Sequence, residues 1–224
     1  MIIQVLIYLN MIGWMIMKNE FIIKTLDEYI PNPKCTLDYN KDYELLIATV
    51  LSAQCTDERV NKITKILWDK YDIYSLSKAN IDDIKSIIYP LGNSNKKSVY
   101  ISEIAKSLVD NYDGKVPNDK AYLLSLPGVG EKVTNVFLAN YYKIPSIAVD
   151  THVLRVSKRL GLAKDTDKPI DVERKLEKVF PKDRWIDLHH ELLLFGRYYC
   201  TARNPKCSNC KFNKICKYYK EVNR

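Results

Sequence analysis

The sequence predicts an all-α protein, and three observations carry the prediction. Through most of the chain, apolar residues recur every three or four positions, which is the spacing of a buried helix face. Strict alternation of apolar and polar residues, which marks a half-buried strand, is scarce. The helical segments are separated by short connections that contain proline or glycine. The prolines in these connections are Pro90, Pro117, Pro127, Pro145 and Pro181.

The first strongly periodic segment is Asp42–Gln54. A second predicted helix begins after Thr56, whose hydroxyl can cap it, and continues through Leu67. Asp57 and Glu58 stand in its first turn, where the positive end of the helix dipole favours acidic side chains. Further helical segments follow at Ile81–Ile88, Lys97–Asn111, Asp119–Ser125, Lys132–Tyr141, Thr151–Leu160, Asp171–Phe180 and Arg184–Tyr199.

The charge of the chain is concentrated near its C-terminal end. Of the 224 residues, 46% are hydrophobic, which is enough for a packed core and excludes a disordered chain. The formal net charge is +8. The segment from Arg197 to Arg224 contains eight basic side chains and one acidic side chain, so it holds nearly all of this excess. Such a segment is either a solvated tail or a surface for an anionic partner such as nucleic acid.

The first seventeen residues carry no charged side chain. They have neither the basic start nor the small-residue cleavage site of a secretory signal peptide. They also fall short of the roughly 20 apolar residues that span a bilayer. Met17 begins a polar stretch, Lys18–Glu20, that resembles the start of a cytosolic protein. We therefore interpret residues 1–16 as a start-site extension and expect no membrane attachment.

Four cysteines lie close together in the basic segment, at Cys200, Cys207, Cys210 and Cys216. Without a secretory signal we expect a reducing compartment, where thiols stay free or bind metal. Four thiolates can hold either a zinc ion or an iron–sulfur cluster. Structural zinc sites usually draw on two tight cysteine pairs, whereas only one pair here is separated by two residues. The spacing therefore favours a cluster and leaves zinc as the alternative.

A short loop, Leu126–Lys132, joins two predicted helices and contains Gly128 and Gly130. Glycines at alternate positions permit a tight turn with exposed backbone amides. At the start of a helix, such amides form an anion site that suits a DNA phosphate. The alternative is an ordinary helix–helix turn, because a lone Gly-x-Gly is a weak signal.

Two titratable residues stand at predicted helix starts. Lys132 lies in the first turn after the loop, where the positive end of the helix dipole disfavours the protonated amine. A neutral amine can form an imine, although a surface lysine is the commoner case. Asp150 precedes the helix that begins at Thr151, so it can cap that helix. Its carboxylate could also stabilise positive charge developing on a sugar carbon, and one residue can serve both purposes.

Three stretches of the sequence occur in one order: Leu126–Lys132, Ala148–His152 and the Cys-x6-Cys-x2-Cys-x5-Cys tail. Together they resemble the endonuclease III family of helix-hairpin-helix DNA glycosylases. Leu51–Asp57 and His189–Arg197 match two further segments of that family. The resemblance covers nearly the whole chain after residue 41, and the combination is far more specific than any single stretch.

The resemblance implies two helical lobes, with damaged double-stranded DNA bound in the cleft between them. Residues 35–144 would form a six-helix barrel that contains the helix-hairpin-helix. Residues 17–34 and 145–224 would form a second domain that holds a [4Fe-4S] cluster. The four cluster ligands fall on Cys200, Cys207, Cys210 and Cys216. We expect a monomer in the cytoplasm of a bacterial or archaeal cell, associated with the nucleoid through DNA.

The resemblance also implies an activity. The family's catalytic lysine falls on Lys132 and its catalytic aspartate on Asp150. The enzyme would remove oxidised pyrimidines in base excision repair and would cut the strand 3′ to the abasic site by β-elimination through a lysine imine. The residue that fills the gap left by the flipped base falls on Gln54.

Two positions depart from the family's pattern. Asn93 aligns with a second gap-filling position that is often an apolar wedge, and an amide stacks less well than leucine. Glu131 replaces a commonly basic residue beside Lys132. In the strongly positive tail, we expect Lys211 and Lys214 to contact DNA phosphates.

Two other functions compete with this hypothesis. Adenine-excising mismatch glycosylases of the same family generally lack a lysine at the position of Lys132 and carry an extra C-terminal domain, whereas this sequence ends soon after Cys216. A non-catalytic DNA-binding module with a zinc clip would share the basic tail and the cysteines. Colour separates an enzyme with an iron–sulfur cluster from the zinc-clip module, since a cluster protein is yellow-brown and a zinc protein is colourless.

Overall fold

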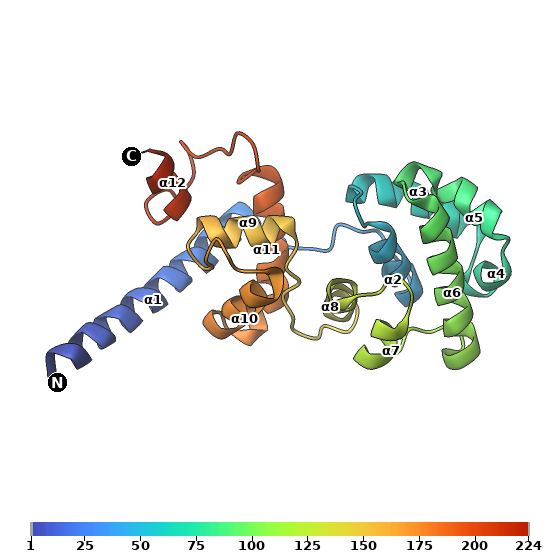
Figure 1. Cartoon of the computed structure of the whole chain (residues 1–224), viewed down its shortest axis with the longest axis horizontal. Helices are drawn as coiled ribbons and strands as arrows, with labels where there is room; N and C mark the ends of the chain where they lie inside the picture. The colour runs from blue at the N-terminus through green and yellow to red at the C-terminus, as the bar shows by residue number, and fades with distance from the viewer. Residues whose placement is uncertain (1, 224) are drawn as a thin grey trace. The chain divides into compact units, whose positions relative to one another are not determined.

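The computed structural model describes the backbone of residues 2–223 and the side chains of residues 13–223. Residues 2–223 contain helices joined by turns and bends and no strand, which confirms the all-α prediction (Figure 1). The elements are α1 (Ile2–Tyr29), α2 (Asp42–Leu51), α3 (Asp57–Lys70), α4 (Ile73–Lys78), α5 (Ile81–Ile88), η1 (Tyr89–Leu91), α6 (Ser94–Tyr112), α7 (Lys120–Ser125), α8 (Glu131–Asn140), α9 (Thr151–Arg159), α10 (Pro169–Val179), η2 (Lys182–Arg184), α11 (Trp185–Tyr198) and α12 (Lys217–Val222). No helix in the described part of the chain is long and apolar enough to cross a membrane.

Most predicted helices differ from the observed ones only at their ends. α5 has the predicted bounds. Thr56 caps α3 as expected, because its side chain accepts a hydrogen bond from the Arg59 amide. The prediction that α2 continues to Gln54 is wrong. The helix ends at Leu51, and Gln54 adopts a left-handed φ of 61°, which a continuing right-handed helix does not allow.

Three helices were not predicted from apolar spacing. α4 and α12 have six residues each, which is fewer than two turns and too short for a periodic pattern. A local signal starts α4: the Asp72 carboxylate accepts a hydrogen bond from the Ser75 amide at 2.8 Å, and the Asp72 amide donates to the Ser75 hydroxyl at 3.0 Å in return. α1 begins in an uncharged stretch that shows no amphipathic spacing, so apolar spacing does not predict it. The side chains of residues 1–12 lie outside the described part.

The chain divides into two compact units, each with its own apolar core. The middle unit is residues 35–144. The terminal unit combines residues 1–34 with residues 145–224. The loop with Lys132 belongs to the middle unit, whereas Asp150 and the four clustered cysteines belong to the terminal unit.

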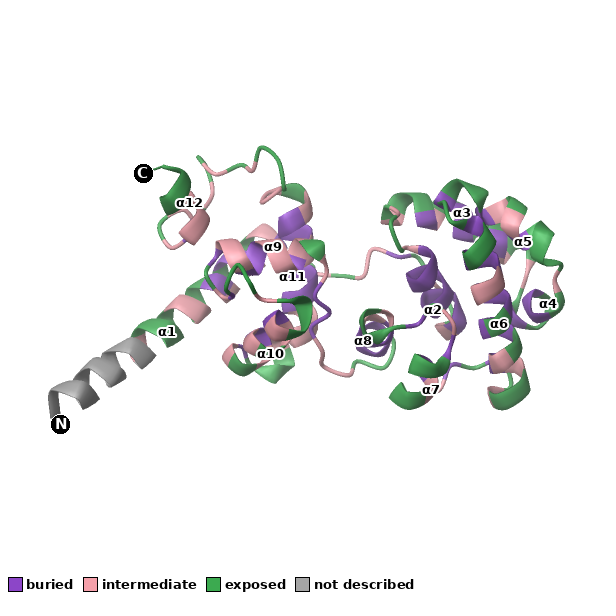
Figure 2. Ribbon diagram, in the orientation of Figure 1, coloured by how far each residue is buried: buried purple, intermediate pink, exposed green. Residues whose placement is uncertain are grey.

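In the middle unit, α2 is the central helix. Every residue from Tyr43 to Leu51 is buried, and Figure 2 colours most of this helix as buried. A helix that is buried on all sides has to be surrounded, and α2 contacts α3, α6 and α8. Its first residue, Asp42, accepts a hydrogen bond from the Val116 amide at 2.7 Å. Because α8 packs on α2, Lys132 near its start is carried by a fixed element.

In the terminal unit, α11 packs against both α9 and α1 (Figure 1). α1 contributes Ile22 and Leu26, which are fully buried. α9 and α11 approach closely at Gly196, where an added Cβ would lie 2.9 Å from the His152 Cβ. A side chain there would push α9 away. Glycine therefore sets the position of the helix that begins after Asp150.

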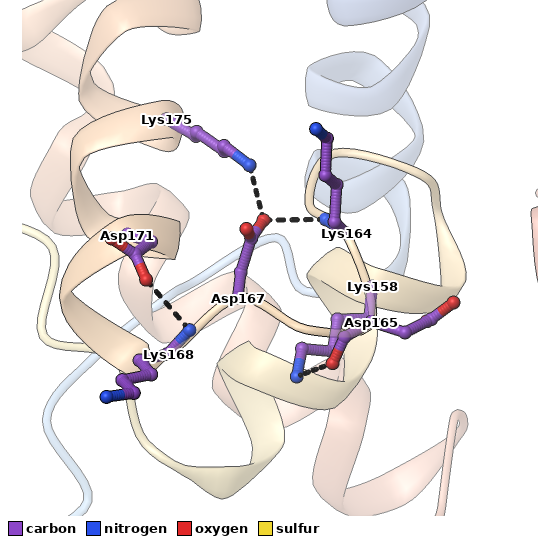
Figure 3. Close-up of polar contacts among 7 residues, drawn as sticks. All are labelled: Lys158, Lys164, Asp165, Asp167, Lys168, Asp171 and Lys175. Carbon is purple, nitrogen blue, oxygen red and sulfur yellow. Dashed lines mark hydrogen bonds and ion pairs between the residues drawn. The ribbon is translucent and has the colours of Figure 1, made fainter.

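The loop between α9 and α10 is held by its own charged residues (Figure 3). The Asp167 carboxylate accepts a hydrogen bond from the Lys164 amide at 2.6 Å and pairs with the Lys175 ammonium. The contact with Lys175 holds the pKa of Asp167 below its usual range. Asp171 accepts a hydrogen bond from the Lys168 amide at 3.0 Å, at the start of α10. These polar contacts stabilise the loop together with Ala163, which is buried in the apolar core of the terminal unit.

A chain that begins at Met17 is expected to fold with an unchanged Tm. In the described part of α1 before this residue, the side chains of residues 14–16 are at least half exposed. The anchoring contacts come later: the Lys18 Nζ donates to the Leu160 carbonyl at 3.0 Å, and Ile22 enters the core. Thermal melting of the two chains checks this prediction. A clear drop in Tm would show that the first residues stabilise the fold.

One carboxyl group in the terminal unit is buried. Glu191 on α11 is fully buried, and its Oε1 accepts a hydrogen bond from the Arg184 Nη2 at 2.8 Å. The same nitrogen donates to the Asp27 carboxylate at 2.6 Å. Burial raises the pKa of Glu191 to about 8, with Arg184 opposing the shift and Asp27 adding to it. In the folded protein this carboxyl group therefore holds its proton near neutral pH.

The raised pKa of Glu191 predicts that stability falls as pH rises. The unfolded chain releases this proton near its ordinary pKa of 4.5 and the folded chain only near 8, so the free energy of unfolding decreases between these values. The contribution to Tm should be at most about 5 °C per pH unit. Glu191→Gln, which resembles the neutral acid, should flatten the decline in melting curves from pH 5 to 8. Glu58→Gln, at an exposed position, should leave it unchanged. Equal slopes for the wild type and Glu191→Gln would contradict the prediction.

Candidate functional site

The loop between α7 and α8 forms a tight turn that depends on one glycine. Gly128 has a φ of +76°, and a Cβ on it would lie 2.7 Å from the Tyr100 ring. Gly130 has a φ of −100° and open space around it. As the N-cap residue of α8, it has no side chain that could accept hydrogen bonds from the amides of the first turn. These amides are therefore available to an anion, because the first four amides of a helix have no partner within the helix.

Lys132 lies in the first turn of α8 and is exposed. Its neighbour Glu131 forms an ion pair with Lys120, with 2.8 Å between the Lys120 Nζ and the Glu131 Oε2. Both partners are more than half exposed. Glu131 is the residue that departs from the family's pattern, and the Lys120 ammonium partly offsets its negative charge. The pair therefore lessens repulsion between the loop and a phosphate.

Asp150 caps α9, as predicted. Its Oδ1 accepts hydrogen bonds from the His152 amide at 2.9 Å and from the Val153 amide at 2.8 Å. Both capping bonds go to the same oxygen, so the cap does not use Oδ2. The carboxylate is half-buried. Oδ1 therefore fixes the start of the helix. Oδ2 remains available to stabilise positive charge, so a single aspartate could serve both as a helix cap and as an electrostatic group.

Two arginines on α9 connect this helix to the cysteine segment. The Arg155 Nε donates to the Cys200 carbonyl at 3.0 Å, and its Nη2 donates to the Gly196 carbonyl at 2.7 Å. The Arg159 Nη1 lies 3.3 Å from the Cys200 Sγ and donates to the Thr201 carbonyl at 2.8 Å. Neither arginine was predicted from the sequence to be a site residue. Their spacing of four residues, which places them on one helix face after Asp150, was an available signal.

The structure brings the four predicted cysteines together. All four line one cavity of about 310 Å³ in the terminal unit, together with Tyr29, Arg159, Phe195 and Phe212. Burial raises the pKa of Cys210 and of Cys216, and the other clustered thiols raise both further. Within the described residues, no three or more His, Cys, Asp or Glu side chains are arranged to hold a single metal ion. The four thiols line one cavity, so this site could hold a metal centre with thiolate ligands.

Gln54 and Asn93 occupy two separate turns of the middle unit. Both are exposed, and both have a left-handed backbone, with φ of 61° and 49°. Gln54 follows the end of α2, and Asn93 precedes α6. Leu91, the nearest apolar side chain to Asn93 in the loop, is 2% exposed and belongs to the core. The exposed group at this turn is therefore the amide of Asn93.

Lys97, which was not predicted from the sequence to be a site residue, links these two turns. It is 4% exposed, and its ammonium donates to backbone carbonyls on both sides. In sequence it is an ordinary lysine near a helix start, and nothing in its neighbourhood signals burial.

The predicted phosphate-binding lysines of the tail have different surroundings. Lys211 pairs with Glu28 on α1, with 2.6 Å between the Lys211 Nζ and the Glu28 Oε2. Its backbone amide donates to the Tyr29 hydroxyl at 3.0 Å. Lys214 is exposed. Exposed ion pairs contribute little to stability because solvent screens them, so a phosphate could compete with Glu28 for Lys211.

Comparison with known proteins identifies the family. The model of the HhH-GPD superfamily base excision DNA repair proteins matches residues 47–182. The chain is 40% identical to endonuclease III of Bacillus subtilis (strain 168) over 203 residues, which cover 88% of this chain and 91% of that protein. It is 39% identical to endonuclease III of Escherichia coli (strain K12) over 202 residues, which cover 90% of this chain and 95% of that protein.

Solved structures agree with the sequence comparison. A trapped endonuclease III–DNA covalent intermediate superposes with a TM-score of 0.86 at 40% identity, over 92% of this chain and 99% of that one. A non-covalent endonuclease III–DNA complex gives a TM-score of 0.88 at 39% identity, over 92% of this chain and 96% of that one. The chain therefore belongs to the HhH-GPD superfamily of base excision DNA repair proteins and, within it, to the endonuclease III family of DNA glycosylases and abasic-site lyases.

Proposed function

We propose that this enzyme removes oxidised pyrimidines from double-stranded DNA and cuts the strand 3′ to the resulting abasic site. The observation that carries the proposal is the exposed amine of Lys132 in the first turn of α8, directly after a loop whose amides can bind a phosphate. A relative at 40% identity has been trapped as a covalent intermediate with DNA, as an enzyme that forms an imine with the sugar would be. The adenine-excising and non-catalytic alternatives provide no use for this amine.

The chemistry requires one amine and several proton transfers. The damaged base leaves the stack, a step that costs least for weakly stacked lesions. The Lys132 Nζ attacks C1′, and the bond between C1′ and the base nitrogen breaks, so the base departs with the electron pair and takes up a proton. The nitrogen lone pair then breaks the C1′–O4′ bond, O4′ takes up a proton, and the nitrogen becomes an imine to C1′. The imine acidifies C2′, and loss of that proton expels the 3′ phosphate as the C3′–O bond breaks.

Asp150 assists the first of these steps in our proposal. A carboxylate stabilises positive charge that develops on the sugar as the base departs, and it helps Lys132 lose its proton. The Oδ2 atom, which the helix cap does not use, is the oxygen available for this role.

The remaining proposed contacts hold the DNA. The amides at Gly128 and Gly130 bind a phosphate next to the lesion. Gln54 and Asn93 fill the gap that the flipped nucleotide leaves in the duplex. Lys214, and Lys211 after release from Glu28, contact phosphates further along the backbone. We further propose that the enzyme acts as a monomer in the cytoplasm of a bacterial or archaeal cell, without membrane attachment.

The four clustered cysteines are proposed to hold a [4Fe-4S] cluster, which members of this family generally carry. The cavity that they line and the basic side chain of Arg159 near Cys200 support this assignment. When bound, the cluster would crosslink the loops between Cys200 and Cys216 and so stabilise the terminal unit as an iron–sulfur domain. The middle unit would be the barrel domain with the helix-hairpin-helix. Glycosyl transfer itself requires no electron.

The direct test of the proposed reaction uses a duplex with one oxidised pyrimidine and a 5′ label. The enzyme alone should release the base and cut the strand, leaving an unsaturated aldehyde on the 3′ end of the labelled fragment. Release of the base without a cut would indicate a glycosylase that lacks the lyase step. Retention of the base would refute the proposal, and excision of adenine from a mismatch would favour the alternative within the family.

The cluster assignment predicts the metal content. Protein purified without oxygen should be yellow-brown and contain about four iron atoms per chain. Cys207→Ala should lose the colour and lower Tm, because metal ligation contributes to folding. Cys35→Ser, at a half-buried cysteine of the middle unit, should keep the full iron content. About one zinc and no iron per chain would establish the zinc clip instead.

A further inference from the structure

Two turns of the middle unit carry the residues that we propose to enter the duplex. The first turn, residues 52–55, links α2 to α3 and presents Gln54. The second, residues 92–93, links η1 to α6 and presents Asn93. A left-handed backbone is uncommon for residues other than glycine, and both Gln54 and Asn93 adopt it. Gln54 and Asn93 can fill the same gap in the duplex only if the two turns keep a fixed separation.

One buried ammonium crosslinks these turns. The Lys97 Nζ donates to the Leu51 carbonyl at 2.9 Å, to the Ala53 carbonyl at 2.9 Å and to the Leu91 carbonyl at 3.0 Å. An ammonium group has three donors, and these three bonds use all of them. Two acceptors lie at or within the first turn and one directly before the second. Lys97 itself sits one helical turn into α6, close to Asn93.

Lysine is an unusual choice for this position. Lysine is almost never fully buried unless it is paired, and among the described residues Lys97 forms no ion pair with a carboxylate. Its charge is instead compensated by carbonyl dipoles. Leu51 is the last residue of α2 and Leu91 is the last residue of η1, so the ammonium lies at the negative ends of two helices. An apolar side chain would fill the space but would leave all three carbonyls without this donor.

A cysteine adds a second connection between the same turns. The Cys55 Sγ donates to the Leu91 carbonyl at 2.8 Å and lies 3.8 Å from the Lys97 Nζ. The Leu91 carbonyl therefore receives hydrogen bonds both from the first turn and from α6. Lys97 and Cys55 together form a polar network that joins the two turns, whose side-chain amides of Gln54 and Asn93 are exposed.

We propose that Lys97 is a positioning residue that holds the Gln54 and Asn93 turns at the separation required to fill the gap in the duplex. The proposal rests on the proposed function of those two residues as gap fillers. Lys97 touches neither the base nor the sugar, so it acts only through the turns. Its loss should therefore impair base extrusion from a duplex and spare the imine chemistry of Lys132.

The test is Lys97→Met, which keeps the length of the side chain and removes its donors. Single-turnover excision of an oxidised pyrimidine from duplex DNA should fall by about 10²-fold, the scale of a misplacement of roughly 1 Å. Cleavage of single-stranded DNA with a preformed abasic site should be unchanged, because it requires no gap to be filled. A 2-aminopurine opposite the lesion should lose the fluorescence change that accompanies base flipping in the wild type. Lys96→Met removes an exposed lysine from the same turn of α6 and should change none of these readings.

Two outcomes would overturn the proposal: normal duplex excision by Lys97→Met, or an equal loss on single-stranded and duplex substrates. Absence of cleavage by the wild type on both the duplex and the single-stranded substrate would instead refute the proposed function. If Lys97→Met does not fold, Lys97→Arg serves in its place, because a planar guanidinium cannot reproduce the three bonds.

A double-mutant cycle separates positioning from general stability. In a background of Gln54→Ala and Asn93→Ala, no gap-filling side chain remains to be positioned. Lys97→Arg should therefore cause no further loss of duplex excision in this background, although it lowers excision in the wild-type background. Equal losses in the two backgrounds would show that Lys97 supports the fold alone.

Discussion

Lys132→Gln is expected to eliminate both base excision and strand cutting, with rates reduced by more than about 10³-fold. Glutamine has no nucleophilic amine, so neither displacement at C1′ nor the imine can occur. The fold should survive, because the side chain is exposed and glutamine is a good helix former. DNA binding should persist, since the backbone amides of the loop remain. Single-turnover assays, gel-shift assays and thermal melting measure the three quantities.

A matched control separates loss of the amine from loss of charge. Lys120→Gln removes a positive charge from the same hairpin, where it pairs with Glu131. It should weaken DNA binding slightly and leave the excision rate at saturating enzyme unchanged. A similar collapse of activity in Lys120→Gln would attribute the effect of Lys132→Gln to the local charge.

Asp150→Asn is expected to reduce base excision by about 10²–10³-fold, which is the usual effect of removing one electrostatic group from a reaction centre. Asparagine caps helices about as well as aspartate, so its Oδ1 can keep the bonds from the His152 and Val153 amides. Tm should therefore change little. Cleavage at a preformed abasic site should suffer less, because no base has to depart. Rates on the two substrates, compared with the melting curve, test this expectation.

The control for Asp150 is another aspartate that caps a helix. Asp72 accepts a hydrogen bond from the Ser75 amide at 2.8 Å at the start of α4. Asp72→Asn should affect neither excision nor the lyase step. If Asp150→Asn lowers Tm and leaves the excision rate intact, the aspartate is a helix cap only.

The sequence predicted the elements whose signals are local. The longer helices of the middle unit could be predicted because their apolar residues recur over several turns. Thr56 and Asp150 were identified as caps because a capping oxygen precedes each helix start in the sequence. The four clustered cysteines could be grouped because they are close in the chain. In each case the residues that interact are also neighbours in the sequence.

Contacts over long sequence separations were not predictable. Lys97 binds carbonyls that lie 46, 44 and 6 residues away, and a backbone acceptor leaves no trace in residue type. The pairing of Lys211 with Glu28 spans 183 residues. The left-handed turn at Gln54 could not be predicted either, because glutamine is not a residue typical of that conformation. It ended α2 three residues before the predicted position.

The most direct test of the lysine-imine mechanism is to trap the intermediate and locate it. The wild-type enzyme is mixed with a duplex that contains one oxidised pyrimidine, borohydride is added, and the crosslinked protein is digested and analysed by mass spectrometry. Reduction should convert the imine into a stable amine, and the sugar should be attached to the peptide that contains Lys132. The absence of a covalent product, or a sugar attached to a different amine, would contradict the mechanism.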